Sequence, residues 1–287
     1  MTYYGAIEAG GTKFILAIGN KNFEIIKQIE IPTQHPKVTL TKIVEFFSSY
    51  QIEGLGIGTF GPVDVRLDSP TYGWITNTPK IEWQNTDLVG YIKKKLSIPI
   101  SIVTDVQASC YGEYLYGAAK EKSSCVYYTV GTGVGGGAIN KGEFVGGISH
   151  PEMGHVIIQK DLQDDFFGVC PFHGNCLEGM ISGPALEKRT HMLGKTIPAD
   201  HPIWKIVSNY LAQAILNTSL TLDTEMFILG GGVFKQKQLL PMVQNEFVKL
   251  NNGYKTIENI NDYIQLASLD GNQAIIGCLA LARDVAK

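Results

Sequence analysis

A short stretch in the middle of the chain carries the side chains best suited to binding a metal ion. Cys170, His173 and Cys176 are spaced Cys-x-x-His-x-x-Cys, which places three soft or borderline donors in one compact loop. His155 would supply a fourth ligand and complete a tetrahedral zinc set of the closed, structural kind. The alternative is three unrelated residues, with the histidine at the surface and the cysteines as small buried hydrophobes. The spacing, together with the neighbouring glycine and proline, favours the zinc site.

Three glycine clusters each end an apolar run that reads as a strand: Gly10-Gly11, the run 131–137 with its five glycines, and 230–232. Glycine permits φ > 0 and leaves backbone N–H groups bare, so such bends are suited to phosphate. A plain hairpin turn is the alternative for the first cluster, and a P-loop is excluded because a strand rather than a helix follows. Taken together, the clusters predict nucleotide contacts from Gly10, Gly11, Thr12, Lys13, Thr132, Gly133, Gly230, Gly231 and Gly232.

Asp105 is the candidate general base. It follows the apolar run 100–103, so it lies at the carboxyl end of an expected strand, where open α/β sheets bind their ligands. It also begins an expected helix over 105–116, and an N-cap is therefore an alternative role that is compatible with the first. Gly61-Pro62 ends another strand at the same edge, and we expect its loop to line the cleft.

The composition restricts the class of protein. The 287 residues carry 24 Lys and Arg against 27 Asp and Glu, a net charge of −3 with no long run of one sign, which disfavours a nucleic-acid partner. No apolar stretch is long enough to span a membrane, so we expect no membrane partner. Five cysteines, an odd number, and an amino terminus without a signal-like pattern predict a cytoplasmic protein.

The order of expected elements predicts an α/β protein with two lobes. The first hundred residues read as three strands, a helix, a strand, a helix and a strand, and a similar strand–glycine–strand order starts again near residue 125. We expect a small lobe of residues 1–115 plus 271–287 and a large lobe of 116–270. The irregular stretch 146–183 is too long for a plain connection, which indicates a functional role.

The order and spacing of the glycine clusters resemble the actin-like ATPase (ribonuclease H-like) fold of sugar kinases. The stretches 104–106, 150–155 and 170–179 together look like the ROK family, in particular its bacterial fructokinase branch. The resemblance implies two lobes, each a mixed sheet flanked by helices, with a zinc-binding loop in the large lobe. It implies ATP-dependent phosphorylation of a hexose, D-fructose at the 6-hydroxyl, with Mg²⁺ accompanying ATP, closure of the lobes on the sugar, and a homodimer.

The resemblance also assigns roles to single residues. Asp105 would take the proton of the attacking sugar hydroxyl, and the substrate-binding residues would be Glu152, His155, Glu178, Gly61, Pro62 and Gln107. For the two glutamates, solvated carboxylates are the alternative. Glu8 and Asp105 are candidates for Mg²⁺, although the family usually has Asp at the first position.

Gln107 stands where the family usually has Asn, and the extra methylene makes the identity of the sugar less secure than the reaction class. The rival functions are therefore a kinase for glucose, mannose or another hexose, and a non-catalytic sugar-binding protein. A sugar-sensing regulator of the same family is disfavoured, because the first strand is expected by Tyr4, which leaves no room for a DNA-binding domain.

Overall fold

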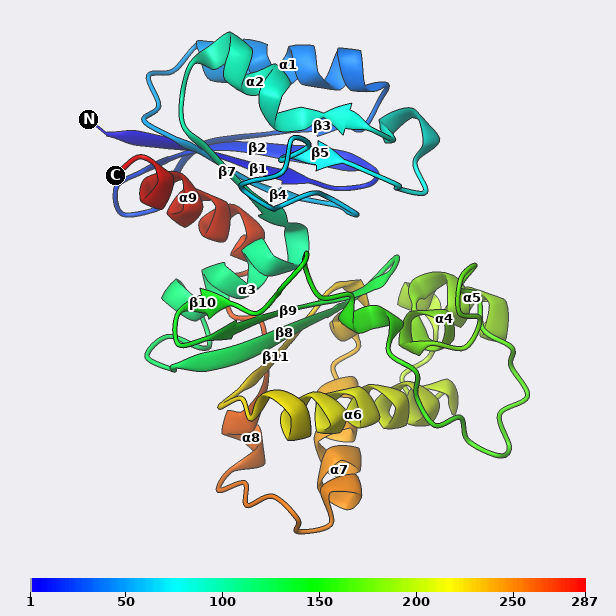
Figure 1. Ribbon diagram of the computed structural model, residues 1–287. Helices are drawn as coiled ribbons and strands as arrows, with labels where there is room; N and C mark the ends of the chain where they lie inside the picture. Colours follow the sequence, from blue (N-terminus) through cyan, green and yellow to red (C-terminus); the bar gives the residue numbers. More distant parts are fainter. Residues whose placement is uncertain (1) are drawn as a thin grey trace. The chain divides into compact units, whose positions relative to one another are not determined.

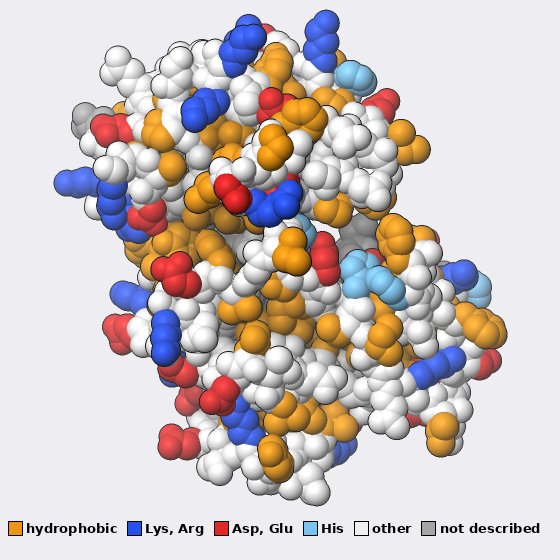
Figure 2. Space-filling model, viewed as in Figure 1, with side chains coloured by type: hydrophobic (Ala, Val, Ile, Leu, Met, Phe, Trp, Pro, Cys, Tyr) orange, Lys and Arg blue, Asp and Glu red, His pale blue; other side chains and the backbone are white. Residues whose placement is uncertain are grey.

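The computed structural model describes residues 2–287, which form two compact units (Figure 1). Unit 1 consists of Met1–Lys120, Val145–His150 and Ser268–Lys287, and unit 2 of Glu121–Phe144 and Pro151–Ala267. On the face drawn in Figure 2, Lys and Arg side chains alternate with Asp and Glu side chains over each unit, as the small net charge predicts. No helix of residues 2–287 has the length and apolar character needed to cross a membrane.

The core of unit 1 is a five-stranded mixed sheet in the order β3-β2-β1-β4-β7, with β1 antiparallel to β2 and parallel to β4. Helices α1 and α2 cover one face, and α3 and α9 cover the other (Figure 1). A two-stranded ribbon of β5 and β6 and a short 3-10 turn, η1, lie between β4 and α2. The bounds are β1 Tyr3–Ala9, β2 Lys13–Asn20, β3 Ile25–Pro32, α1 Pro36–Ser48, β4 Leu55–Thr59, β5 Trp74–Ile75, η1 Ile81–Trp83, β6 Thr86–Asp87, α2 Leu88–Leu96, β7 Ile100–Thr104, α3 Asp105–Tyr116 and α9 Gln273–Val285.

Helices α3 and α9 cross at very short range because both have glycine at the crossing. A Cβ at Gly112 would lie 2.1 Å from the carbonyl oxygen of Gln273, and one at Gly277 would lie 1.9 Å from that of Ala108. Any larger residue at either glycine would push the helices apart. This close packing fixes the start of α3 against the sheet.

Unit 2 contains a second five-stranded sheet, in the order β10-β9-β8-β11-β12, with β8 antiparallel to β9 and parallel to β11. The long helix α6, buried along most of its length, packs against α7. The bounds are β8 Ser124–Val130, β9 Val134–Asn140, β10 Glu143–Phe144, η2 Met153–His155, α4 Leu177–Ile181, α5 Gly183–Thr190, η3 Gly194–Thr196, α6 Ile203–Leu222, β11 Phe227–Gly230, η4 Gly232–Lys235, α7 Leu239–Asn251, α8 Ile260–Tyr263 and β12 Ile264–Leu266.

The second glycine cluster is only partly a bend. Its last residues, from Val134 onward, belong to β9, and the bend itself is limited to residues 131–133. A Cβ at Gly136 would lie 2.8 Å from the Cβ of Met153, and one at Gly154 would lie 1.7 Å from the carbonyl oxygen of Val134. Glycine at Gly136 and Gly154 therefore permits close packing of η2 on the strand.

Candidate active site and metal centre

Three parallel strands of unit 1 end in register at one edge of the sheet. Ala9 pairs with Thr59, and Thr59 pairs with Thr104. The residues that follow them at this edge are Gly10, Phe60 and Asp105. The register therefore brings the first glycine bend, the start of the Gly61–Pro62 loop and the candidate base to one edge, as the carboxyl ends of parallel strands predict.

Asp105 is the first residue of α3, and Thr104 is its N-cap. The Asp105 Oδ1 accepts a hydrogen bond from the backbone N–H of Val106 at 2.9 Å. Because capping is done by the threonine, the aspartate is not needed for that role. A carboxylate at the first turn of a helix is also favoured by the helix dipole.

Gln107 closes a capping box with Thr104. Its Oε1 accepts hydrogen bonds from the backbone N–H of Thr104 at 3.1 Å and from its hydroxyl at 3.2 Å, while the hydroxyl accepts from the Gln107 N–H at 3.2 Å. The side chain is buried. The sequence Thr-x-x-Gln was the available signal for this arrangement. Its predicted contact with sugar stays a prediction.

Glu8 lies on β1 one residue before this edge, and its Oε2 is buried with no hydrogen-bond partner among residues 2–287. Burial, followed by the negative charge of Asp105, raises the pKa of Glu8 from 4.5 to about 7, while Lys13 acts in the opposite direction. A carboxylate oxygen left without a donor and beside a second carboxylate is the donor set that Mg²⁺ prefers. These two residues therefore fit a magnesium ion.

The first glycine bend is a tight hairpin, in which the Gly10 N–H donates to the carbonyl oxygen of Lys13 at 2.9 Å. Thr12 and Lys13 are exposed, and the Lys13 ammonium is paired with Glu30 on β3. A phosphate at this bend would have to compete with Glu30 for the lysine. The predicted phosphate contacts of the bend stay predictions.

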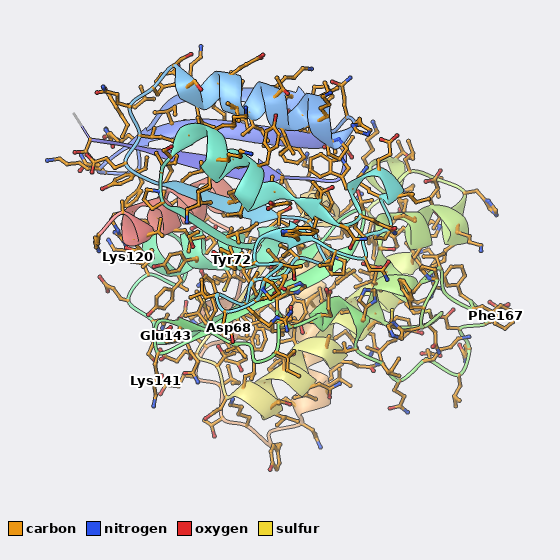
Figure 3. The ribbon with its side chains drawn as sticks, turned by 45° about the horizontal axis from the view of Figure 1, so that its top comes forward. Asp68, Tyr72, Lys120, Lys141, Glu143 and Phe167 are labelled. Atoms are coloured by element: carbon orange, nitrogen blue, oxygen red, sulfur yellow. The ribbon has the colours of Figure 1, made fainter. Side chains whose placement is uncertain are left out.

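The loop after Gly61–Pro62 is held by a side chain that the sequence reasoning missed. Asp64 is buried and accepts hydrogen bonds from the guanidinium of Arg66 at 2.9 and 2.8 Å and from the hydroxyls of Ser69 and Thr71 at 2.5 and 2.7 Å. These bonds, with the guanidinium first, hold the pKa of Asp64 well below its usual range. Asp68 and Tyr72 of this loop are labelled in Figure 3. An aspartate followed within seven residues by Arg, Ser and Thr was the only sequence signal.

The other two glycine bends are neighbours within unit 2. A Cβ at Gly131 would lie 3.8 Å from the backbone nitrogen of Gly232, and Gly231 has φ = 91°, which favours glycine. The N–H of Gly183 donates to the carbonyl oxygen of Gly131 at 2.7 Å, so the start of α5 meets the same place. Backbone from two strand ends and one helix start therefore meets here with few side chains in between, which suits the close approach of a phosphate.

Glu178 lies on α4, and its carboxylate is joined to the second glycine bend. Its Oε2 accepts from the backbone N–H of Val134 at 3.0 Å, and a Cβ at Gly133 would come within 2.7 Å of the same oxygen. Glu152, the other carboxylate assigned to sugar, is exposed at the start of η2. Their contacts with a sugar stay predictions.

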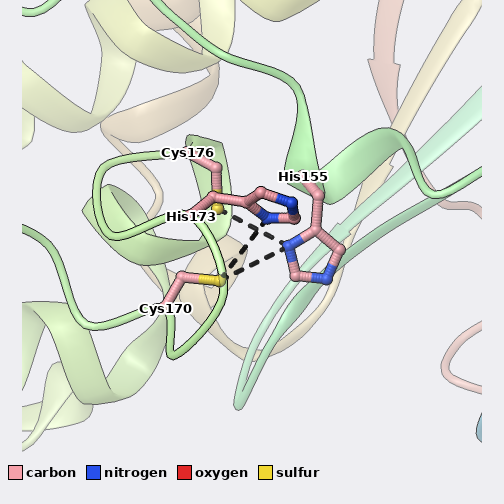
Figure 4. A group of neighbouring side chains, drawn as sticks. All are labelled: His155, Cys170, His173 and Cys176. Carbon is pink, nitrogen blue, oxygen red and sulfur yellow. Dashed lines mark hydrogen bonds between the residues drawn. The ribbon is translucent and has the colours of Figure 1, made fainter.

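The four predicted zinc ligands come together in unit 2 (Figure 4). Their donor atoms all lie within 4.8 Å of one another. The Nδ1 of His155 is 3.7 Å from the Sγ of Cys170 and 3.5 Å from that of Cys176, and the Nδ1 of His173 is 3.8 Å from the Cys170 sulfur. Around a tetrahedral zinc ion, a sulfur and a nitrogen ligand are separated by roughly 3.6 Å. The set therefore fits a zinc ion, and burial raises the pKa of the Cys176 thiol to about 11 in its absence.

The segment between η2 and α4 is anchored by a buried ion pair that the sequence did not reveal. The carboxylate of Asp164 accepts from the guanidinium of Arg189 on α5 at 2.9 and 2.8 Å and from the hydroxyl of Tyr210 on α6 at 2.6 Å. These bonds outweigh burial and lower the pKa of Asp164 to about 2. Phe167, three residues further on, points away from the unit and is 89% exposed (Figure 3).

Two mixed five-stranded sheets, each flanked by helices and each ending in bare glycine bends, define the class of actin-like ATPase folds. The ROK hexokinase of Thermus thermophilus has this fold, with a TM-score of 0.81 at 20% identity over 98% of both chains. The ROK family matches residues 4–285, and the chain belongs to it. Among curated proteins it is 47% identical to a fructokinase of Lactococcus lactis subsp. cremoris over 98% of this chain and 97% of that protein. It is 42% identical to a fructokinase of Pediococcus pentosaceus, over 99% and 98% of the two chains.

Proposed function

We propose that this chain is an ATP-dependent fructokinase that transfers the γ-phosphoryl group of ATP to the 6-hydroxyl of D-fructose. The observation that carries the proposal is identity of more than 40% with fructokinases over nearly the whole chain. The site in unit 1 supports it, because an aspartate stands at the carboxyl edge of the sheet, directly after the threonine that caps α3.

In this mechanism Asp105 accepts the proton of the sugar hydroxyl as it attacks phosphorus, which contributes about 10²–10⁴-fold to the rate. Glu8, Asp105 and the helix dipole at the start of α3 surround the edge where charge changes during the transfer. Glu8 and Asp105 would hold Mg²⁺, which supplies charge neutralisation on the phosphates. The glycine bends, which carry no side chains, would let the nucleotide approach the backbone closely, and the rest of the catalysis is positioning.

Unit 2 supports the sugar side of the proposal. His155, Cys170, His173 and Cys176 would hold a structural zinc ion, which fixes the irregular segment between η2 and α4. Glu152, His155 and Glu178, with Gly61, Pro62 and Gln107 of unit 1, would contact the hexose. We further propose that residues 1–115 plus 271–287 and residues 116–270 act as the two lobes, and that the protein works as a cytoplasmic homodimer.

A coupled assay of ADP release over a panel of sugars tests the function. We expect the largest kcat/KM with fructose, and substantially lower values with glucose, mannose and amino sugars. A larger value for another hexose would replace fructose with that sugar and retain the kinase class. Nucleotide binding without turnover on any sugar would favour the non-catalytic rival and reject the proposal.

A further inference from the structure

The sequence of unit 1 is interrupted twice by segments of unit 2, so the chain passes between the units four times. One side chain, that of Glu113, forms hydrogen bonds beside two of these four connections. The chain leaves unit 1 after Lys120, labelled in Figure 3, and returns to it for the last time at Ser268. Glu113, on the last turn of α3, lies beside both points. Its side chain is fully buried.

The carboxylate of Glu113 accepts four hydrogen bonds, all from these two segments. Ala118 donates its N–H at 2.8 Å, Ser268 its N–H at 2.8 Å and its hydroxyl at 3.0 Å, and Leu269 its N–H at 3.1 Å. The backbone carbonyl of the same residue accepts from the N–H groups of residues 117 and 119. Both the outgoing and the returning segment are therefore fixed to one residue.

A carboxylate suits this contact because every group that faces it is a donor. No Lys, Arg or His side chain is paired with Glu113 in the described part of the chain, and a negative charge at the carboxyl end of a helix is opposed by the helix dipole. Such a buried charge is tolerated only where donors fill its lone pairs, which the four bonds do. A Cβ at Gly117 would lie 2.0 Å from the Glu113 Oε2, so the adjacent glycine is needed for this arrangement as well.

The last connection, from Ala267 in unit 2 to Ser268 in unit 1, has no linker residues. The N–H of Ala267, in unit 2, donates to the carbonyl oxygen of Leu229 on β11 at 2.9 Å. The next residue, Ser268, is bound by Glu113 through both its N–H and its hydroxyl. Consecutive residues are thus fixed to different units, so at this connection any rotation of one unit against the other must be absorbed by the φ and ψ torsions of Ala267.

We infer that Glu113 is a positioning residue that fixes two of the four connections between the units at their ends in unit 1, and thereby restricts motion of the chain at these two points. Its printed hydrogen bonds go to no residue proposed to bind substrate, so its effect on the reaction is indirect. That kinetic consequence rests on the proposed function, whereas the mechanical role does not.

The mechanical role is tested by a distance measurement that needs no activity. Nitroxide labels are attached to cysteines that replace Lys37 on α1 and Lys188 on α5, both exposed and one in each unit. In pulsed electron paramagnetic resonance, we expect Glu113→Gln to broaden the distance distribution, because its amide group faces N–H donors. Glu113→Asp, which keeps the charge but shortens the reach, should broaden it too, and it carries the test if the glutamine variant does not fold.

The matched control is Asn251→Ala. Asn251 is also buried and joined twice to the backbone, to Lys255 at 2.8 and 3.0 Å, but it lies wholly within unit 2. It should lower the melting temperature without widening the distribution. A distribution for both Glu113 variants as narrow as that of the unsubstituted labelled protein would overturn the inference.

Kinetics provide the second readout. With fructose and ATP, Glu113→Gln should lower kcat by about tenfold or more, because displaced reacting groups lose orientation, and Asn251→Ala should not. Loss of the proposed function would appear as an unsubstituted enzyme that is inactive on every sugar, with the distance result unaffected. A broadened distribution with an unchanged kcat would overturn the kinetic part alone.

Discussion

The edge of the sheet in unit 1 and the cysteine–histidine segment of unit 2 are positioned by different physical means. At the sheet edge, strand register and a helix cap place Asp105, so backbone hydrogen bonds of three strands and the cap of α3 determine its position. Between η2 and α4 there is little regular structure; one buried ion pair anchors the chain, and four His and Cys side chains come together where a metal ion would fix it further. Replacing one side chain at the edge should therefore change the chemistry, whereas replacing one in the segment should change the fold.

The largest effect is expected from the metal. Chelation, or Cys170→Ala, should lower the melting temperature sharply, since a structural zinc ion contributes on the order of 10 kcal/mol to folding. Elemental analysis should find about one zinc per chain in the unsubstituted protein and almost none in the variant. Cys125→Ala, at a buried cysteine of β8 outside the set, is the control and should retain the metal. A metal-free protein with an unchanged melting temperature would contradict the idea that a metal ion fixes the segment between η2 and α4.

Asp105→Asn should change catalysis rather than stability, the opposite of Cys170→Ala. We expect kcat to fall at least about a hundredfold, with little change in nucleotide affinity or in melting temperature, because the amide cannot accept the proton. Asp87→Asn is matched to it: Asp87 also stands at the start of a helix in unit 1, and its Oδ1 caps α2 through the N–H of Gly90 at 2.7 Å. Near-normal turnover in Asp105→Asn would remove it from the role of base.

The ion pair of the segment gives the next largest effect. Asp164→Asn leaves the buried guanidinium of Arg189 without its counter-charge, which costs about 3–5 kcal/mol of stability. In denaturant titrations, Asp223→Asn should have little effect, because Asp223 pairs with Lys255 at the exposed surface. The Asp164 pKa of about 2 lies below its ordinary 3.8, so its contribution is present above pH 3.8 and is lost as pH falls toward 2. Equal midpoints for the two variants would show that the pair does not anchor the segment.

The same contrast explains what the sequence could predict. Apolar runs and glycine breaks indicated the strand–helix order of unit 1, and α3 begins and ends at the expected residues, because local patterns determine such elements. The gathering of His155, Cys170, His173 and Cys176 was also predicted, since the spacing of the last three is local, and their binding of zinc stays a prediction. Asp164, Asp64 and Glu113 were missed because their partners are brought near only by tertiary packing. The capping role of Gln107 was not predicted, although its motif was readable in the sequence, and its contact with sugar stays a prediction.

The smallest effect tests whether the buried carboxylate of Glu8 at the sheet edge lowers the stability of the folded protein when it is ionised. Glu8 has a folded pKa of about 7 against an ordinary value of 4.5, so between these values the folded protein retains a proton that the unfolded chain releases. Stability should therefore fall as pH rises from 4.5 to 7, by up to about 3 kcal/mol. Glu8→Gln should remove this slope in denaturant titrations across that range, and Mg²⁺ should reduce it in the unsubstituted protein. Parallel curves of stability against pH for the two proteins would mean that the Glu8 carboxylate is solvated. That result would contradict a preformed cation site at this edge.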